Sequence, residues 1–278
     1  NRVFNTGFFN HNKFRIVAVK RHTTTIIPSG NDQILANDLV YFICTKENLE
    51  YVRIAAGKTN FEIKNIIIMG GSKIALKTVQ YLPNDIDVKI IENDREKCYK
   101  LADKTDTLII HGDGRNIDLL KDEGIEDADA FIALTDNSET NVLACLAAKR
   151  FGIRKTIAEL ENIDYIDLAD NLDIGTLINK KLIAASYIYQ ETLDEDAYDV
   201  QCLTYSDAEV VEFVVKAGDR ITRDRVRNLN LPEDVNIGGV VRNGKGYIVN
   251  GNTVILPGDH VVIFCKATGV QKLAKFFN

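Results

Sequence analysis

The middle of the chain alternates between short apolar runs and segments whose apolar residues recur at helical spacing. Residues 65–69 become an unbroken apolar run after Asn65, which is typical of a strand buried on both faces of a parallel sheet. Residues 74–82 place apolar side chains every three or four positions, which indicates a helix. The same alternation predicts strands at 88–91, 107–110, 130–134 and 155–160 and helices at 97–104, 117–123 and 138–151. Strands that alternate with helices predict parallel crossovers and a doubly wound α/β sheet.

Two flanking segments repeat each other at an offset of 221 residues. Residues 16–44 align without a gap with residues 237–265, and 11 of these 29 positions are identical. Both copies predict two strands joined by a turn, then a polar turn, a third strand at 40–44 or 261–265, and a helical tail. A further strand is predicted at 210–215, before the second copy. The flanks therefore predict two related small domains.

Composition excludes several classes of function. The 278 residues include 34 Lys and Arg against 40 Asp and Glu, for a net charge of −6, without a basic block that would bind nucleic acid. No apolar run approaches the roughly 18 residues that a membrane-spanning helix needs, so we expect no direct membrane insertion. The five cysteines contain no C-x-x-C pair, and the four histidines show no metal-ligand spacing. We predict no metal-binding and no catalytic residue, and a protein that is not an enzyme.

A glycine turn follows the first predicted strand of the sheet. It reads Gly70-Gly71-Ser72-Lys73-Ile74-Ala75, in the place of the G-x-G-x-x-G/A turn of dinucleotide-binding folds. Gly70 fits the tight turn and Ala75 the helix packing, but Ser72 replaces the middle glycine. The Ser72 side chain could crowd a phosphate, or its hydroxyl could hold one together with Lys73 and the helix amides. A fold of this class that has lost its ligand is the alternative.

Further candidate residues stand at the carboxyl ends of predicted strands, where open α/β sheets bind ligands. Glu92 comes 22 residues after the first glycine, where an acidic residue meets ribose hydroxyls. A carboxylate there disfavours a 2′-phosphate, so we expect NAD or an adenosine nucleotide rather than NADP. Asp113 could accept a hydrogen bond from an adenine amino group, and Thr135 and Asp136 could line the same crevice. For Asp113 and Asn137, turn and helix-cap roles are the alternative.

Seven segments resemble the TrkA-type regulatory subunits of bacterial potassium uptake, which are built from RCK (KTN) domains. The segments are 66–71 (IIIMGG), 88–92 (VKIIE), 112–113 (GD), 133–137 (ALTDN), 178–185 (INKKLIAA), 238–242 (GGVVR) and 257–261 (PGDHV). The resemblance implies a Rossmann-like doubly wound parallel sheet flanked by two small α+β RCK C-terminal domains. It places the end of a first tandem unit at 1–58, a nucleotide-binding domain at 63–195 and a second C-terminal domain at 197–278. Since the chain starts at Asn1 and the first copy is shorter, we interpret it as a fragment of a longer tandem protein.

The resemblance also implies a mode of action. Residues 163–195 would be crossover helices through which two nucleotide-binding domains form a homodimer, and the full-length chain would form a ring-like tetramer. The apolar residues of 163–193 cover more than one narrow stripe, which independently indicates a partner surface. NAD(H) or ATP/ADP would rearrange these domains and gate a TrkH-like membrane subunit that translocates potassium. The protein would be cytoplasmic and peripheral at the inner face of the plasma membrane through that partner.

One departure from the family and two alternative functions bear on this interpretation. Glu159 stands where relatives often have an arginine near the phosphates. An NAD-dependent oxidoreductase is the alternative to a regulator, but it needs a proton-relay residue that the small repeats do not offer. The repeated pairs Arg21/Arg242 and Asp38/Asp259 could bind a small ligand of their own, or they could be turn and packing residues.

Overall fold

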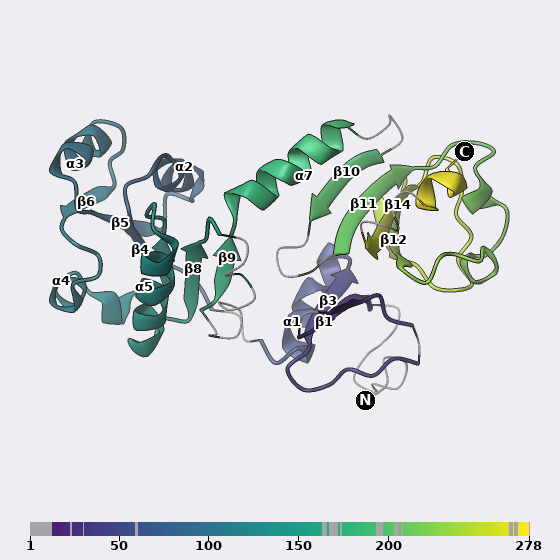
Figure 1. Ribbon diagram of the computed structural model, residues 1–278, viewed down its shortest axis with the longest axis horizontal. Helices are drawn as coiled ribbons and strands as arrows, with labels where there is room; N and C mark the ends of the chain where they lie inside the picture. Colours follow the sequence, from purple (N-terminus) through teal and green to yellow (C-terminus); the bar gives the residue numbers. More distant parts are fainter. Residues whose placement is uncertain are drawn as a thin grey trace. The chain divides into compact units, whose positions relative to one another are not determined.

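The computed structural model describes residues 13–22, 24–29, 31–58, 61–162, 166, 172, 174–192, 197–202, 206, 208–266, 269 and 272–277. The chain divides into two compact units. One unit is Phe61–Lys181, and the other consists of Asn1–Asn60 together with Leu182–Asn278. Figure 1 labels most of the helices and strands of both.

Six parallel strands form the sheet of the unit Phe61–Lys181, in the spatial order β6-β5-β4-β7-β8-β9. The strands are β4 Asn65–Met69, β5 Asp87–Glu92, β6 Leu108–His111, β7 Ala130–Ala133, β8 Lys155–Glu159 and β9 Thr176–Ile178. The helices between them are α2 Lys73–Tyr81, α3 Arg95–Ala102, α4 Ile117–Asp122 and α5 Ser138–Arg150 (Figure 1), with a short 3-10 helix at Ile125–Asp127. The chain runs outward from β4 to β6 and then returns to β7 beside β4, so the order reverses there. The predicted Rossmann-like fold class is confirmed.

Burial of the central strands and capping of the helices explain why this sequence adopts the fold. Ile66, Ile68 and Ile90 form a buried cluster with Ala75 of α2, as the unbroken apolar run of β4 requires. Each of the helices α2 to α5 begins after a residue whose side chain accepts a hydrogen bond from the first helical turn: Ser72, Asp94, Asn116 and Asn137. The strands thus share one hydrophobic core with α2. The caps determine the residue at which each helix begins, at the carboxyl edge of the sheet.

The segment after β8 differs from the predicted helix pair. Residues 176–178, placed in the predicted helical segment, form β9, which pairs in parallel with β8. A three-residue strand carries too little periodicity to be separated from a helix by pattern alone. Most of the first predicted crossover helix, at 163–165, 167–171 and 173, lies outside the described residues. The second is present as α7, Lys180–Thr192.

The other unit contains the sequence repeat as two antiparallel sheets. The first has the order β2-β1-β3, with β1 Phe14–Arg21, β2 Thr24–Ile26 and β3 Leu39–Cys44, followed by a 3-10 turn at Lys46–Asn48 and α1 Leu49–Ala55. The second has the order β10-β11-β14-β12-β13, with β10 Ala197–Cys202, β11 Ala208–Val214, β12 Val235–Arg242, β13 Lys245–Ile248 and β14 His260–Lys266. Short 3-10 helices lie at Arg220–Thr222, Val226–Asn228 and Ala274–Phe276. The strand β10 was not predicted.

The two copies agree down to strand register. Val19 pairs with Val40 in the first copy, and Val240 pairs with Val261 in the second, which is the same pair displaced by 221 residues. Both copies also shift register at the same place, between residues 16 and 18 and between residues 237 and 239. A β-bulge that recurs at one position of a repeat is a conserved device for twisting the strand.

The repeated Arg and Asp residues hold each other across the polar turn of each copy. In the first copy Arg21 donates two hydrogen bonds to Asp38, at 2.9 and 2.7 Å. In the second, Arg242 donates two to Asp259, both at 2.7 Å. Each aspartate also accepts the backbone N–H of the residue three positions before it, at 2.8 Å. These pairs therefore close the turn before the third strand, which supports the turn-and-packing alternative over a ligand site.

A departure from the repeat lies where the two copies meet within this unit. Gly238 of β12 stands where the first copy has Val17. A Cβ at Gly238 would lie 2.9 Å from Val17 and 3.1 Å from Ile43. The Arg15 guanidinium also donates a 2.7 Å hydrogen bond to the carbonyl oxygen of Val249. The second copy therefore uses glycine where the first copy's sheet packs against it.

Candidate functional site

A cavity of about 800 Å³ lies at the carboxyl edge of the parallel sheet. It is bordered by the loops that follow β4, β5, β6 and β7 and by one face of α3. Eight of the nine predicted binding residues line it: Gly70, Gly71, Ser72, Lys73, Glu92, Asp113, Thr135 and Asp136. The ninth, Ile74, packs against the core cluster beneath α2 instead. The fold thus brings together most of the predicted site, and the binding role of each residue stays a prediction.

Gly70 makes the tight turn that leads from β4 into α2. Its φ is +100°, a backbone conformation that side chains rarely permit. A Cβ at Gly70 would lie 2.9 Å from the carbonyl carbon and oxygen of Leu134 and from the nitrogen of Thr135. The Gly70 N–H donates to the carbonyl oxygen of Ile91 at 2.8 Å. Glycine is required here because the turn presses against the backbone that follows β7.

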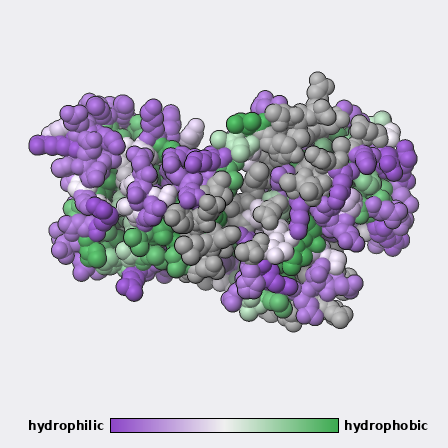
Figure 2. All heavy atoms as spheres, viewed as in Figure 1, coloured by the Kyte–Doolittle hydropathy of each residue, from purple (hydrophilic) through white to green (hydrophobic). Residues whose placement is uncertain are grey.

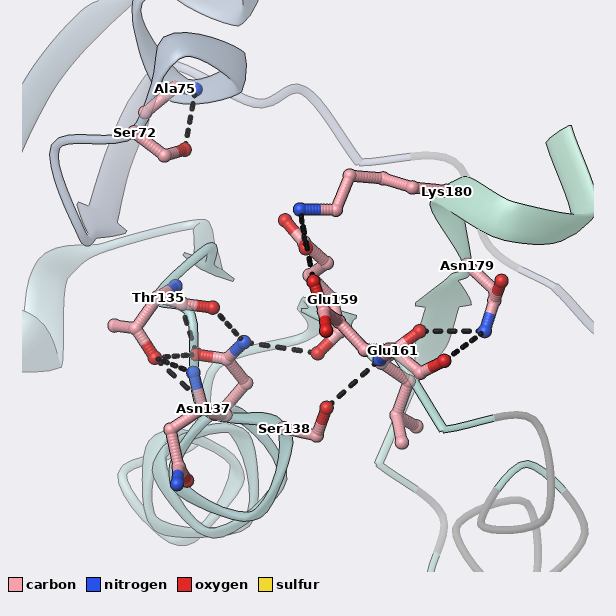
Figure 3. Close-up of polar contacts among 11 residues, drawn as sticks. Ser72, Ala75, Thr135, Asn137, Ser138, Glu159, Glu161, Asn179 and Lys180 are labelled. Carbon is pink, nitrogen blue, oxygen red and sulfur yellow. Dashed lines mark hydrogen bonds and ion pairs between the residues drawn. The ribbon is translucent and has the colours of Figure 1, made fainter. Parts of the chain in front are cut away.

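Ser72 caps α2 rather than facing an open phosphate site with a free hydroxyl. Its Oγ accepts the backbone N–H of Ala75 at 3.2 Å (Figure 3), and its backbone is extended, as is usual for a helix N-cap. The hydroxyl therefore occupies one of the amides that a phosphate at this helix start would use. A ligand phosphate has to displace the Ser72 hydroxyl or bind beside it.

We expect Ser72→Gly to bind adenine nucleotide about fivefold more tightly, which is ~1 kcal/mol. The change frees the Ala75 amide and removes a side chain from the phosphate path, whereas glycine at an N-cap costs the helix only a few tenths of a kcal/mol. Calorimetric titration with ADP measures the gain. Asn116→Gly, which removes the cap of α4 at a residue that does not itself line the cavity, should leave affinity unchanged. Equal affinity of Ser72→Gly and the parent protein would show that Ser72 does not obstruct the site.

Glu92 is buried at the end of β5 and held by two backbone groups. One carboxylate oxygen accepts the Gly71 N–H at 2.7 Å, and the other accepts the Asp94 N–H at 2.8 Å. The residue is only 5% exposed, although it lines the cavity. A carboxylate oxygen has two lone pairs, so each oxygen keeps one for a ligand hydroxyl. Glu92 therefore fixes the glycine turn and can still meet a ribose.

The carboxylate of Asp113 is hydrogen-bonded by Arg115 of its own turn, which the sequence did not indicate. The Arg115 guanidinium donates to both carboxylate oxygens, at 2.7 to 3.1 Å, and the Arg115 N–H donates at 2.9 Å. The hydrogen bonds from the Arg115 side chain hold the pKa of Asp113 below its ordinary value. The observed contacts of Asp113 are therefore those of a turn residue, the alternative that the sequence left open. Arg115 lines the cavity as well.

A buried amide ties the ends of β7 and β8 together. Asn141 on α5 is fully buried and accepts from the Thr135 N–H at 3.0 Å and from the Thr135 hydroxyl at 2.6 Å. Its own amide donates to the carbonyl oxygens of Thr135 and Glu159, at 2.9 and 3.0 Å. Asn137 caps α5 through the Thr140 N–H, as its alternative role predicts. The Thr135 loop is therefore connected through Asn141 to the end of β8.

Glu159, which stands where the resemblance predicts an arginine, is paired within the chain. Glu159 is 2% exposed, and its carboxylate forms an ion pair with the ammonium of Lys180, the first residue of α7 (Figure 3). Hydrogen bonding to Glu159 raises the pKa of Lys180 above its ordinary value. The Asn179 side chain adds a 2.8 Å hydrogen bond to the carbonyl oxygen of Leu160. The end of β8 is thus fastened to the start of α7.

Several cavity residues were missed by sequence reasoning. They are four cations, Lys97, Lys100, Lys104 and Arg115, and the uncharged residues Leu76, Asn93, Leu101 and Thr140. The lysines recur at intervals of three and four in the segment that begins with α3, which is a helical spacing. That spacing was available from the sequence, but lysines at such intervals occur on many solvated helix faces and do not by themselves indicate a site.

Comparison with known proteins identifies the family. Residues 66–180 match the TrkA-N domain, and residues 5–54 and 210–278 match the TrkA-C domain. The chain belongs to the TrkA family. It is 29% identical over 254 residues to the Trk system potassium uptake protein TrkA of Halomonas elongata, covering 90% of this chain and 56% of the relative. A protein of the same name from Haemophilus influenzae is 29% identical over 273 residues, covering 96% of this chain and 60% of that protein.

This TrkA-family chain spans less than two thirds of the length of those relatives. Among solved structures, the GsuK RCK domain is similar to this chain, with a TM-score of 0.52 and 14% sequence identity. The match covers 100% of this chain and 60% of the GsuK chain, and it supports the fold. In the part of the chain that the structure describes, no helix has both the length and the hydropathy needed to cross a membrane.

Proposed function

We propose that this chain is part of a nucleotide-sensing regulatory subunit of potassium uptake. An adenine nucleotide, NAD(H) or ATP/ADP, binds in the cavity at the carboxyl edge of the sheet, and the protein itself catalyses no reaction. The carrying observation is that eight of nine predicted ligand residues line one cavity in a chain of the TrkA family. Cavities at this reversal of strand order are the usual ligand sites of doubly wound folds.

The residues at the cavity fit the parts of an adenine nucleotide. The start of α2 and Lys73 supply N–H donors and a positive charge for the 5′-phosphates. The two oxygens of Glu92 retain acceptor capacity for ribose hydroxyls. Gly70 and Gly71 keep the turn free of side chains. Bound nucleotide regulates only if its affinity differs between two arrangements of the domains.

The ion pair between Glu159 and Lys180 gives the nucleotide edge a direct connection to α7. Lys180 is the first residue of α7, and Glu159 is the last residue of β8. The backbone carbonyl oxygen of Glu159 accepts a hydrogen bond from Asn141, which also holds the loop at Thr135. A phosphate that shifts this loop therefore acts on the helix that we assign to dimerisation. In this proposal residues 63–195 form the nucleotide-binding domain, and residues 1–58 and 197–278 are C-terminal domains of two tandem units.

The membrane partner and the location follow from the family. We infer a TrkH-like membrane subunit that translocates potassium, and a cytoplasmic protein held at the inner face of the plasma membrane by that subunit. The names of the relatives and the lack of a spanning helix among the described residues support this assignment.

The homodimer surface is assigned to α7. Ile183, Tyr187 and Ile188 are 49%, 66% and 66% exposed, and Figure 2 shows the resulting apolar surface over this helix. Ile183 and Tyr187 are four residues apart and so share one side of the helix. Exposed large apolar side chains that share a helix face are typical of a protein interface. The full-length protein then assembles such dimers into a ring-like tetramer.

We expect Ile183→Glu/Tyr187→Glu to weaken dimerisation about 100-fold, because two apolar anchors become charges at the interface centre. Sedimentation or light scattering across a concentration series measures the monomer–dimer equilibrium. Ala185→Glu is the control, since a residue two positions along lies on the opposite side of the helix. Unchanged association of the double variant would remove α7 from the interface.

Potassium flux decides the function. The full-length protein would be reconstituted with its membrane subunit, and flux would be recorded with and without NADH, NAD, ATP and ADP. We expect nucleotide to change the flux and calorimetry of this chain to show binding. Flux indifferent to nucleotide would sink the regulatory proposal. The oxidoreductase alternative would instead be favoured if the purified chain transferred hydride to a carbonyl substrate.

A further inference from the structure

The ligand cavity covers one half of the carboxyl edge of the sheet. A doubly wound sheet binds a dinucleotide across the point where the strand order reverses, with one nucleoside on each side of it. Here the order reverses between β4 and β7, so a second nucleoside would lie over the ends of β7, β8 and β9. The cavity extends to the loop after β7, and no described residue of β8, β9 or α7 lines it. The cavity therefore has room for the first nucleoside and its phosphates.

The end of β8, residues 159–161, is closed by hydrogen bonds within the chain. The Ser138 hydroxyl at the start of α5 accepts the Glu161 N–H at 2.9 Å (Figure 3). The Asn179 side chain donates to the carbonyl oxygens of Leu160 and Glu161, at 2.8 and 3.3 Å. These contacts join the end of β8 to α5 on one side and to the residue after β9 on the other. A second nucleoside would have to break them to reach this strand end.

The ion pair between Glu159 and Lys180 occupies the same place. Glu159 is 2% exposed, and its carboxylate contacts the ammonium of Lys180 (Figure 3). The same ammonium lies 3.6 Å from the carboxylate of Glu161. The first residue of α7 is thus tied to two residues at the end of β8. Separating a buried carboxylate from its partner is costly, so this pair resists displacement by a ligand.

The open half of the edge suits a terminal phosphate group. Lys73, Lys97 and Lys100 line the cavity on this side of the sheet, and the start of α2 adds backbone N–H donors. The last phosphate of ADP or ATP has a second ionisation near neutral pH, like the phosphate of a phosphorylated side chain. Both phosphates of NAD(H) are esterified and lack it. Cations in the open half therefore favour ADP or ATP over a dinucleotide.

We propose that the cavity is specific for adenine mononucleotides with a 5′-di- or triphosphate, and that the closed end of β8 excludes NAD(H). Glu159 and Lys180 determine this specificity by filling the place of the second nucleoside, without contact with the bound mononucleotide. The inference rests on the proposed nucleotide site and narrows its ligand from the two classes named there to one.

Calorimetric titration of this chain with ADP, ATP, NAD and NADH tests the inference. We expect ADP and ATP to bind at least about tenfold more tightly than either dinucleotide, a difference of ~1.4 kcal/mol or more. NAD or NADH binding as tightly as ADP would overturn the inference and leave the proposed function standing. Absence of binding by all four ligands would overturn both the inference and the nucleotide site.

The variant Glu159→Ala/Lys180→Ala assigns the exclusion to the end of β8. It makes room there without leaving either charge alone, and it should bring NADH to within about threefold of ADP. Glu159→Gln/Lys180→Gln removes the charges but keeps the size of both side chains, so it should keep the preference for ADP. An unchanged preference in the alanine variant, or its loss in the glutamine variant, would contradict exclusion by the space that these side chains fill.

Lys89→Ala/Glu123→Ala is the matched control. It removes another ion pair of the same unit, with its charged atoms 3.2 Å apart, and neither residue lines the cavity. This variant should keep the preference for ADP. A preference lost equally in the control and in Glu159→Ala/Lys180→Ala would show a general effect of destabilising the unit and contradict the assignment.

Discussion

Gly70→Ala should destabilise the unit Phe61–Lys181 by about 3 kcal/mol and abolish nucleotide binding. Two costs add. Alanine at a φ of +100° is strained, and its Cβ would press against the backbone of Leu134 and Thr135 at 2.9 Å. Backbone atoms cannot move aside as the end of a flexible side chain can, so the turn and the loop after β7 must separate. Because both border the cavity, the ligand site is lost with them.

Gly124→Ala provides a matched comparison within the same unit. Gly124 also has a positive φ, of +79°, but a Cβ there would meet nothing within 4 Å. This variant should cost only about 1 kcal/mol, for the left-handed backbone alone. Urea unfolding followed by circular dichroism and titration with ADP would measure both effects. Equal losses in the two variants would show that close packing at Gly70 has no role.

The parallel sheet was predictable because burial on both faces leaves a strong sequence pattern. Each predicted strand from 65 to 160 matches an observed strand to within about two residues, and the helices begin beside polar caps such as Ser72 and Asp94. The small repeats were predictable for a different reason. Two copies of one sequence confirm each other, and the shared register of Val19/Val40 and Val240/Val261 is the structural counterpart of that identity.

What the sequence could not predict depended on tertiary contacts. The strand β9 has only three residues, too few to show a period of its own. The strand β10 does alternate apolar and polar residues from Tyr198 to Cys202, and this signal was missed. At the site, the pattern predicted Glu92 and Asp113, which line the cavity, but could not show that backbone amides hold one and Arg115 holds the other. The cavity lysines Lys97, Lys100 and Lys104 were missed because lysines at helical spacing indicate a site only when a cavity lies beside them.

Asp259→Asn should destabilise the second copy of the repeat by about 2 kcal/mol, the scale of a charged hydrogen bond inside a protein. Asp259 is 1% exposed and accepts from Arg242 twice and from the Leu256 N–H. The neutral amide leaves the Arg242 charge without its partner and turns one acceptor into a donor. Hydrogen exchange of β12 and β14, compared with β1 and β3, would localise the loss. Asp38→Asn should produce the reverse pattern, with faster exchange in the first copy.

The same variant should also change the response to acid. Burial by itself raises the pKa of Asp259, but hydrogen bonds from Arg242 and the Leu256 amide outweigh it and hold the pKa below its ordinary value. A carboxyl whose folded-state pKa is depressed stabilises the fold above its unfolded value, near pH 4, and loses that contribution as the pH falls through the folded value. The stability difference between the parent protein and Asp259→Asn should therefore be full at pH 7 and narrow on acidification below about pH 4. Urea unfolding at pH 7 and pH 3 measures it, and a difference that stays constant would mean that the charge of Asp259 contributes nothing to holding the turn.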